Sequence, residues 1–296
     1  LVKPVSARIV RLARKLPAGD LPLSTRRIDK LRVVGAGREV ALSTGSVVKA
    51  FGPVVAVDNV TLRLDAGLIH GLIGSNGAGK TTLFNILCGA IVPDSGSVRL
   101  FGDEVSGESA IRRLNRGMTR TFQNIGLFGD LSCVENVRIG QGRNSVRQTL
   151  GDMGAVVSER TSVLATYRAA LDALDLLGLG DLADKPAGEL PLGAQRRLEI
   201  ARAVVSRPKI LLLDEPVAGI PVEQHGEIAD ILRRLQRSLD ITIVIIEHNI
   251  GFVRQVSDTL TVMSLGKVIA EGEPEQVLAR SDVRAAYFGE EPSAAA

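Results

Sequence analysis

The sequence predicts an α/β domain built around a parallel β-sheet. Short aliphatic runs alternate with helix-like segments through the second half of the chain, and strands that alternate with helices form parallel sheets. Hydrophobic residues make up 45% of the 296 residues but aromatic residues only 3%, so the core must consist mainly of Leu, Ile, Val and Ala. Buried parallel strands have this aliphatic composition. The alternation and the composition together favour a parallel α/β architecture.

Residues 1–46 are expected to form a basic extension or linker ahead of the folded domain. Residues 1–40 contain ten Lys or Arg and three Asp or Glu, whereas the rest of the chain carries a net charge of −4. Four apolar residues in this part recur at helical spacing: Val5, Ile9, Leu12 and Leu16. The pattern favours either a short amphipathic helix resting on anionic lipid or an unstructured basic linker. The acidic balance of the remaining chain argues against a nucleic-acid-binding surface.

Hydropathy and cysteine spacing narrow the class of protein further. The longest aliphatic runs, such as Ile241 to Ile246, are far shorter than the roughly 18 residues that a spanning helix needs. Residues 1–20 contain no continuous apolar segment of the kind found in signal peptides. Cys88 and Cys133 occur in no metal-binding or redox spacing, which favours a reducing compartment. Any membrane association is therefore expected to come through partner proteins.

The folded domain is predicted to span residues 47–290, with a short tail over 291–296. Residues Val47 to Leu64 alternate enough to predict short antiparallel strands. The segments predicted after them are, in order, a strand at Leu68 to Ile73, a helix at Thr81 to Cys88, a strand at Val98 to Phe101, a helical insertion over about 124–190, a helix at Arg196 to Val205, a strand at Ile210 to Leu213, a helix at Glu223 to Leu239 and a strand at Ile241 to Ile246. This order combines an antiparallel part, a parallel sheet and an inserted helical part.

A glycine-rich loop follows the strand predicted at Leu68 to Ile73. It matches the pattern G-x-x-x-x-G-K-S/T in full with Gly74, Ser75, Asn76, Gly77, Ala78, Gly79, Lys80 and Thr81. Glycines let backbone N–H groups curl around a phosphate, and the helix that follows directs its positive end at the anion. Lys80 is expected to contact the β- and γ-phosphates and the Thr81 hydroxyl to coordinate Mg²⁺, with Thr82 among the nucleotide contacts. A strand before the loop and a helix after it argue against a chance match, so the loop predicts nucleotide binding.

Two acidic residues follow the aliphatic strand at Ile210 to Leu213. Asp214 is suited to hold Mg²⁺ through its water shell, and Glu215 can polarise a water for in-line attack on the γ-phosphate. Adjacent residues on a strand point to opposite faces, so the two carboxylates need not share one task. A strand that ends in solvated acids would be common by itself. Its combination with the phosphate loop predicts hydrolysis of the bound nucleotide.

Two polar residues, Gln123 and His248, are informative in combination with the phosphate loop. Gln123 follows the segment Arg120 to Phe122, and His248 comes directly after Glu247, beyond the last predicted strand. They resemble the Q-loop glutamine and the switch histidine of the ATP-binding cassette (ABC) ATPases, and they occur in the same order along the chain. A lone Gln or His is usually structural, so it is the combination that indicates this family.

The segment Leu190 to Arg197 is similar to the signature Leu-Ser-Gly-Gly-Gln of the same family. Gly193 matches the second signature glycine, and the helix that follows would direct its N-terminal amides at a phosphate of a partner subunit. Pro191 replaces the signature serine, and Pro221 stands where the family's D-loop usually ends in Asp or Asn. Both departures affect parts that act on the partner's nucleotide. Our hypothesis is that the contribution to the partner's site is weakened while this chain's own phosphate loop is intact.

The resemblance to the ABC ATPases implies a fold and a set of site residues. The fold is a P-loop NTPase with a RecA-like parallel sheet core, an antiparallel β subdomain and an inserted helical subdomain. Phe51 occupies the position of the family's adenine-stacking aromatic residue, with a core phenylalanine as the alternative. The implied ligands are ATP and Mg²⁺, and the implied metal ligands are Thr81, Gln123 and Asp214. The implied catalytic residues are Glu215, His248 and Gln123.

Three stretches are similar to the ATP-binding subunits of bacterial branched-chain amino-acid importers. They are Arg120 to Phe128, Gln195 to Arg202 and Ala285 to Glu290, and the last two are shared with related urea and lipopolysaccharide ATPases. The resemblance implies a second ABC ATPase subunit, identical or different, together with membrane permease subunits and, indirectly, a solute-binding protein. It places the chain at the cytoplasmic face of the plasma membrane. The basic extension could then be the end of a fused permease.

Other functions share parts of this pattern. A urea, amide or lipopolysaccharide transporter would use the same cassette with other permeases. A soluble ABC ATPase acting on nucleic acid or ribosomes usually carries two cassettes or long coiled coils, and neither is visible in the sequence. A kinase or GTPase with a phosphate loop is opposed by the joint occurrence of Gln123, Gly193 and His248. The transported solute itself contacts the permease and the binding protein, so this chain does not specify it.

Overall fold

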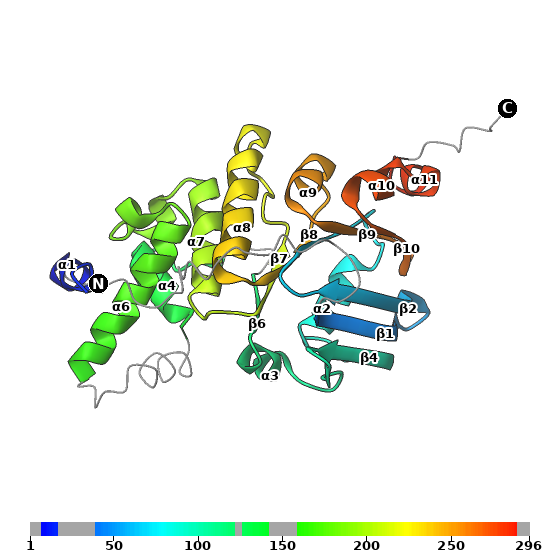
Figure 1. Cartoon of the computed structure of the whole chain (residues 1–296), viewed down its shortest axis with the longest axis horizontal. Helices are drawn as coiled ribbons and strands as arrows, with labels where there is room; N and C mark the ends of the chain where they lie inside the picture. Colours follow the sequence, from blue (N-terminus) through cyan, green and yellow to red (C-terminus); the bar gives the residue numbers. More distant parts are fainter. Residues whose placement is uncertain (1–6, 17–38, 122–125, 142–158, 289–296) are drawn as a thin grey trace.

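A computed structural model describes residues 7–16, 39–121, 126–141 and 159–288, and its elements form three parts (Figure 1). An antiparallel sheet and a mostly parallel sheet share one hydrophobic core with helix α2 between them. Helices α4, α6 and α7 gather at the end of the molecule away from the antiparallel sheet (Figure 1). Helices α10 and α11 lie at the edge of the parallel sheet that β9 and β10 form (Figure 1). The arrangement agrees with the predicted combination of a parallel core, an antiparallel part and a helical part.

Within the described residues the smaller sheet is antiparallel, with the strand order β2-β1-β4-β5. Its strands are β1 (Val40–Phe51), β2 (Val54–Asp65), β4 (Ser95–Leu100) and β5 (Asp103–Glu104). Because β1 begins at Val40, the folded part begins before residue 47, where the sequence predicted its start. The first part of β1 contains polar residues, so a hydropathy pattern does not identify it as a strand. Thr44 is one of them, and its burial is tolerated because its hydroxyl donates to Val60 O and accepts from Leu62 N.

The larger sheet has the strand order β10-β9-β3-β8-β7-β6. Its strands are β3 (Ile69–Gly74), β6 (Met118–Arg120), β7 (Ile210–Asp214), β8 (Thr242–Ile246), β9 (Thr259–Ser264) and β10 (Lys267–Gly272). All neighbours pair in parallel except β9 and β10, which are antiparallel. Along β7, Leu212 packs on the α2 side while Leu211 and Leu213 pack on the side of α7 and α8. Side chains alternate along a strand, so Asp214 at its end faces the α2 side with Leu212.

The predicted helices are present with shifted ends, and the structure adds α3, α9, α10 and α11, which were not predicted from the sequence. The described helices are α1 (Ala7–Ala13), α2 (Lys80–Leu87), α3 (Ala110–Asn115), α4 (Cys133–Ile139), α6 (Glu159–Leu176), α7 (Leu192–Val204), α8 (His225–Leu239), α9 (Ile250–Val256), α10 (Pro274–Ala279) and α11 (Ser281–Phe288), with 3₁₀ turns η1 (Gly180–Leu182), η2 (Ala187–Glu189) and η3 (Val222–Gln224). Helix α7 begins at Leu192 and not at Arg196, because Pro191 has the extended conformation of an N-cap residue (φ −57°, ψ 152°). Among the helices described, none is long and apolar enough to cross a membrane.

The N-terminal helix α1 packs against α6 of the helical part (Figure 1). Val10 and Ala13 are buried, whereas Leu12 is 44% exposed, so the predicted apolar stripe through Leu12 is wrong. The Arg14 guanidinium donates to the Gly180 carbonyl at 2.9 Å, which fixes the end of the helix. An unstructured linker is therefore also wrong for this segment, and the apolar side of α1 is used against the protein itself. Val5, the first residue of the predicted stripe, lies outside the described residues.

Arg113 of α3 is fully buried and joins the end of α2 to the segment that follows β5. Nη1 of Arg113 donates to the carbonyls of Ile86 and Leu87 at the end of α2, both at 2.6 Å. Nη2 donates to the carbonyls of Val105 at 2.6 Å and Ser106 at 3.3 Å. Burial lowers the pKa of the Arg113 guanidinium from its usual value. The cation thus terminates the helix that begins at the phosphate loop.

Replacing Arg113 by Leu is expected to lower the free energy of unfolding by at least about 3 kcal/mol, because carbonyls left buried without a donor are costly. Its neighbour Arg112 is exposed, and Arg112→Leu should change stability by no more than about 0.5 kcal/mol. Urea unfolding of the two variants and the wild type measures both effects. Equal stabilities of the two variants would contradict the role assigned to Arg113.

Candidate active site

The phosphate loop joins β3 to α2 and depends on glycines at defined positions. Gly77 and Gly79 have positive φ values of 80° and 95°. A Cβ atom on Gly79 would lie 2.1 Å from the Ala56 carbonyl of β2, so only glycine allows the loop to pass this strand. Ala78 is buried and its N–H donates to the Ser75 carbonyl. The segment Ser75 to Gly77 is exposed, which leaves the mouth of the loop open to a ligand.

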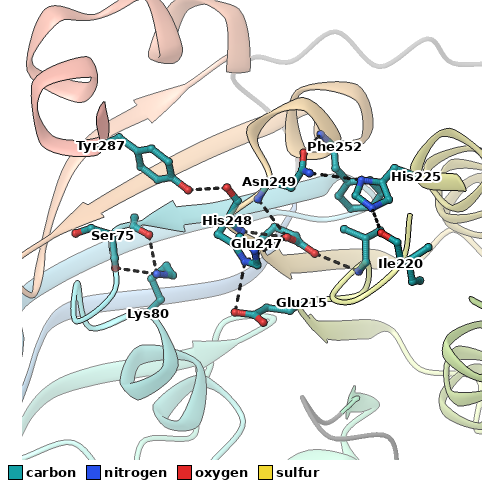
Figure 2. Close-up of polar contacts among 12 residues, drawn as sticks. Ser75, Lys80, Glu215, Ile220, His225, Glu247, His248, Asn249, Phe252 and Tyr287 are labelled. Atoms are coloured by element: carbon teal, nitrogen blue, oxygen red, sulfur yellow. Dashed lines mark hydrogen bonds and ion pairs between the residues drawn. The ribbon is translucent and has the colours of Figure 1, made fainter. Parts of the chain in front are cut away.

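Lys80 lies at the start of α2 and folds back over the phosphate loop (Figure 2). Its Nζ donates to the carbonyls of Gly74 at 2.7 Å and Ser75 at 2.9 Å. Burial lowers the pKa of the Lys80 ammonium, and the nearby carboxylates of Glu215 and Asp214 oppose that shift. The Lys80 ammonium lies close enough to both carboxylates for their charges to act on it, so the predicted phosphate loop and the two predicted carboxylates lie in one site. Thr81 and Thr82 follow Lys80 in the first turn, and Thr81 is exposed.

Asp214 is buried at the end of β7 and accepts a charge-assisted hydrogen bond. Its Oδ2 lies 2.7 Å from Nη2 of Arg120, and the Arg120 guanidinium stacks on the ring of Phe84 in α2. The Thr81 hydroxyl and the Asp214 carboxylate are hard oxygen ligands of the kind that Mg²⁺ takes together with phosphate oxygens. The donor set therefore fits this ion. Gln123, the remaining predicted metal ligand, lies outside the described residues.

Glu215 and His248 face each other at the edge of the sheet (Figure 2). Oε1 of Glu215 lies 3.7 Å from Nδ1 of His248. Glu215 has left the strand, with a positive φ of 48°, so the alternation along β7 does not determine its direction. Its N–H still donates to the Ile246 carbonyl of β8. The His248 side chain is 61% exposed, which leaves the imidazole accessible to a ligand.

The other predicted binding residues lie on separate parts of the chain. Phe51 ends β1 and is 50% exposed, with the Lys49 ammonium 5.6 Å from the ring centre, so the alternative of a core phenylalanine is wrong. Gly193 lies in the first turn of α7, in the helical part. Pro221 precedes η3 and is exposed. An exposed ring can serve as a stacking platform, whereas Gly193 lies on a different element from the phosphate loop.

Sequence reasoning missed two charged residues that shape the site. Arg120 pairs with Asp214, although in the sequence it stands out only as part of a motif. Glu247 is 1% exposed and binds the backbone of two loops, although in the sequence it is only the neighbour of His248. A charged residue directly after a buried aliphatic strand is the signal that could have identified Glu247. Nothing in the local sequence indicated the partner of Arg120.

Comparison with known proteins identifies relatives over most of the chain. Residues 57–218 match the family model of ABC transporters, and residues 267–292 match that of the branched-chain amino acid ATP-binding cassette transporter. The chain is 36% identical over 249 residues to the high-affinity branched-chain amino acid transport ATP-binding protein BraF of Pseudomonas aeruginosa, covering 84% of this chain and 98% of that protein. The corresponding protein LivG of Escherichia coli K12 gives the same identity and coverage.

Solved structures give the same result for the fold. The ADP conformation of an ATP-binding cassette of an ABC transporter superposes with a TM-score of 0.74 at 32% identity, covering 85% of this chain and 99% of the other. A nucleotide-free cassette gives a TM-score of 0.71 at 31% identity, covering 85% and 100%. The predicted fold class is thus confirmed. With the phosphate loop and the carboxylates assembled on that fold, the chain belongs to the ABC transporter family as an ATP-binding cassette.

Proposed function

We propose that this chain is the ATP-hydrolysing subunit of an importer that takes up branched-chain amino acids. The observation that carries hydrolysis is the pairing of Glu215 with His248 beside the Lys80 ammonium. The solute class is supported by relatives whose names specify branched-chain amino acid transport and by the match of residues 267–292 to a family of the same description. Urea, amide and lipopolysaccharide transport are the alternatives for the solute.

Each predicted site residue has a task in this proposal. The open phosphate loop and Lys80 bind the β- and γ-phosphates, while Phe51 stacks on the adenine. Mg²⁺, when held by Thr81, Gln123 and Asp214, supplies Lewis-acid stabilisation of the phosphate charge. Glu215 orients a water molecule and accepts its proton as the water oxygen attacks the γ-phosphorus and the bond to ADP breaks. His248 is close enough to Glu215 to contact the same γ-phosphate.

A second cassette, identical or different, would complete the site. Gly193 and the N-terminal amides of α7 lie in the helical part, while the phosphate loop of the same chain lies between the two sheets (Figure 1). The amides of α7 therefore suit the γ-phosphate held by a partner subunit. Closure of the pair around ATP would move permease subunits docked at the cytoplasmic face of the plasma membrane. A solute-binding protein would deliver the amino acid from the other side.

Reconstitution in proteoliposomes with the permeases, the partner cassette and the binding protein tests the proposal. Leucine-loaded binding protein should stimulate both ATP hydrolysis and leucine uptake, and Glu215→Gln in this chain should abolish the uptake. Stimulation by urea in place of leucine would overturn the solute class. An assembled complex that binds ATP without hydrolysing it would overturn the enzymatic assignment.

The two prolines at the partner-facing surface provide a separate prediction. Pro191 is the N-cap of α7 and forms no side-chain capping bond. Pro191→Ser and Pro221→Asp should together raise the ATPase rate of the assembled complex by about two- to tenfold, as one or two restored hydrogen bonds would allow. Pro191→Ser should also stabilise the isolated chain by about 1 kcal/mol through the new cap. Unchanged ATPase rates in a complex with this added stability would show that the prolines do not weaken the partner's site.

A further inference from the structure

A buried carboxylate stands directly before the switch histidine. Glu247 follows β8 and is 1% exposed. In the part of the chain that the structure describes, its hydrogen bonds come from backbone N–H groups, and its Oε2 also lies 3.8 Å from Nδ1 of the His248 ring. Burial raises the pKa of the Glu247 carboxyl, and the N–H donors oppose that shift. A buried acceptor of this kind fixes its donors in place, because each of them would otherwise lose its partner.

The donors to Glu247 come from two different loops (Figure 2). Oε1 accepts from the N–H of Val217 at 3.1 Å, in the loop that begins with Glu215. Oε2 accepts from the N–H groups of His248 at 3.0 Å and Asn249 at 3.3 Å, in the connection between β8 and α9 (residues 247–249), here called the switch loop. One side chain thus joins the loop of the candidate general base to the loop of the candidate phosphate ligand.

A second connection joins the same two loops through His225 of α8. Nε2 of His225 lies 2.9 Å from the Ile220 carbonyl, to which its ring N–H can donate. The Asn249 amide lies 3.5 Å from Nδ1 of the same ring and caps α9 by accepting from the N–H of Phe252. The segment from Val217 to Ile220 is therefore attached to the switch loop at both of its ends.

The backbone of the switch residue is also held from the C-terminal side. The Tyr287 hydroxyl of α11 donates to the His248 carbonyl at 2.7 Å (Figure 2). The N–H of His248 is held by Glu247 and its carbonyl by Tyr287, whereas its imidazole is 61% exposed. The backbone is fixed and the ring remains accessible.

We propose that Glu247 is a positioning residue for ATP hydrolysis, which sets His248 and Glu215 at a fixed separation by clasping the backbone of both loops. It also makes the switch loop respond to the loop that continues to Pro221 at the partner-facing surface. Glu247 touches neither nucleotide nor water in this role, and it acts through the two residues that do. The inference rests on the hydrolysis part of the proposed function and is independent of the solute.

Glu247→Gln tests the role with almost no change of shape. The amide keeps one acceptor oxygen, but its NH₂ group faces a backbone N–H, so one loop is released. The expected result is a fall in kcat of about 10- to 100-fold, with the KM for ATP and the Kd for a fluorescent ATP analogue changed by less than about threefold. Glu104→Gln, which alters an exposed carboxylate of the antiparallel sheet, is the matched control.

A spectroscopic measurement separates positioning from general stability. The chain contains three histidines, so ¹³C,¹⁵N-histidine labelling gives few ring signals, which substitution of each histidine assigns. In Glu247→Gln the ring signals of His248 should broaden, because a released backbone lets the ring occupy several positions, while those of His70 stay in place. Loss of the carboxylate 3.8 Å from Nδ1 of His248 would by itself only shift these signals. Wild-type kcat together with sharp His248 signals would overturn the proposal. A variant that loses thermal stability, nucleotide binding and kcat together would also overturn it, because that result indicates general destabilisation of the fold. If the wild type hydrolyses no ATP, the proposed function fails, while the His248 signals still report on Glu247.

Discussion

Replacing Glu215 by Gln is expected to slow ATP hydrolysis by about 10²- to 10⁴-fold, the usual contribution of a general base, and to leave ATP binding intact. The amide has the size of the carboxylate and can still orient a water, but it cannot accept the proton of that water. Binding depends on the phosphate loop and Lys80, which keep their contacts with Gly74 and Ser75. A phosphate-release assay and titration with a fluorescent ATP analogue measure the two quantities.

Glu215→Gln should also trap the state that precedes hydrolysis. If two cassettes enclose the γ-phosphate, this variant should form an ATP-dependent dimer with its partner cassette, which light scattering during gel filtration detects. The control is Glu104→Gln, which should hydrolyse ATP at the wild-type rate and form no lasting dimer. A Glu215→Gln rate within about tenfold of wild type would show that another group accepts the proton.

The places of the contiguous motifs in the fold could be predicted from the sequence. The phosphate loop is a short run whose glycines determine its backbone shape, as the fit of Gly79 against Ala56 demonstrates. Asp214 was predictable for a similar reason, since a buried aliphatic strand directs the residue at its end to a known edge of the sheet. Element starts were less accurate. Thr44 is polar but buried through hydrogen bonds to β2, which no hydropathy pattern reveals.

The supporting contacts could not be predicted, because their partners are distant in sequence. Arg120 and Asp214 are 94 positions apart, and Glu247 and Val217 are 30 positions apart. Such pairs form only when the parallel strands β6, β7 and β8 align their ends. A single sequence contains the charges without this alignment. The contacts of Arg113 could not be predicted for the same reason, because its guanidinium reaches the carbonyls at the end of α2 only when α3 packs beside that helix end.

Replacing Lys80 by Met is expected to weaken ATP binding by at least about 100-fold, since charge-assisted hydrogen bonds to phosphate are lost. The same change should leave the nucleotide-free protein as stable as the wild type or more stable. Burial is the largest influence on the Lys80 pKa and lowers it, so the folded protein without nucleotide holds this charge at a cost. Titration with ATP and thermal unfolding without it measure the two effects in one preparation.

The direction of the stability effect follows from proton linkage. The pKa of Lys80 is lower in the folded state than its ordinary value of 10.5. Below the folded pKa the ammonium is charged in both states, so its full burial cost is present throughout that range of pH. Between the folded pKa and 10.5 the unfolded chain holds more protons, so this group makes the stability of the wild type rise with pH. The gain in stability from Lys80→Met, relative to the wild type, should therefore shrink as the pH rises toward 10.5.

Lys185→Met separates this effect from the general consequence of removing a lysine, because Lys185 is an exposed residue of the helical part. It should leave ATP binding unchanged and shift Tm little at any pH. For Lys80→Met, each 1 kcal/mol of relieved burial would raise Tm by roughly 2 to 4 °C. A lower Tm would mean that the bonds from Nζ to the carbonyls of Gly74 and Ser75 outweigh the burial of the charge. Lys80 would then hold the empty loop together, whereas a higher Tm would mean that the loop keeps a destabilising cation in readiness for phosphate.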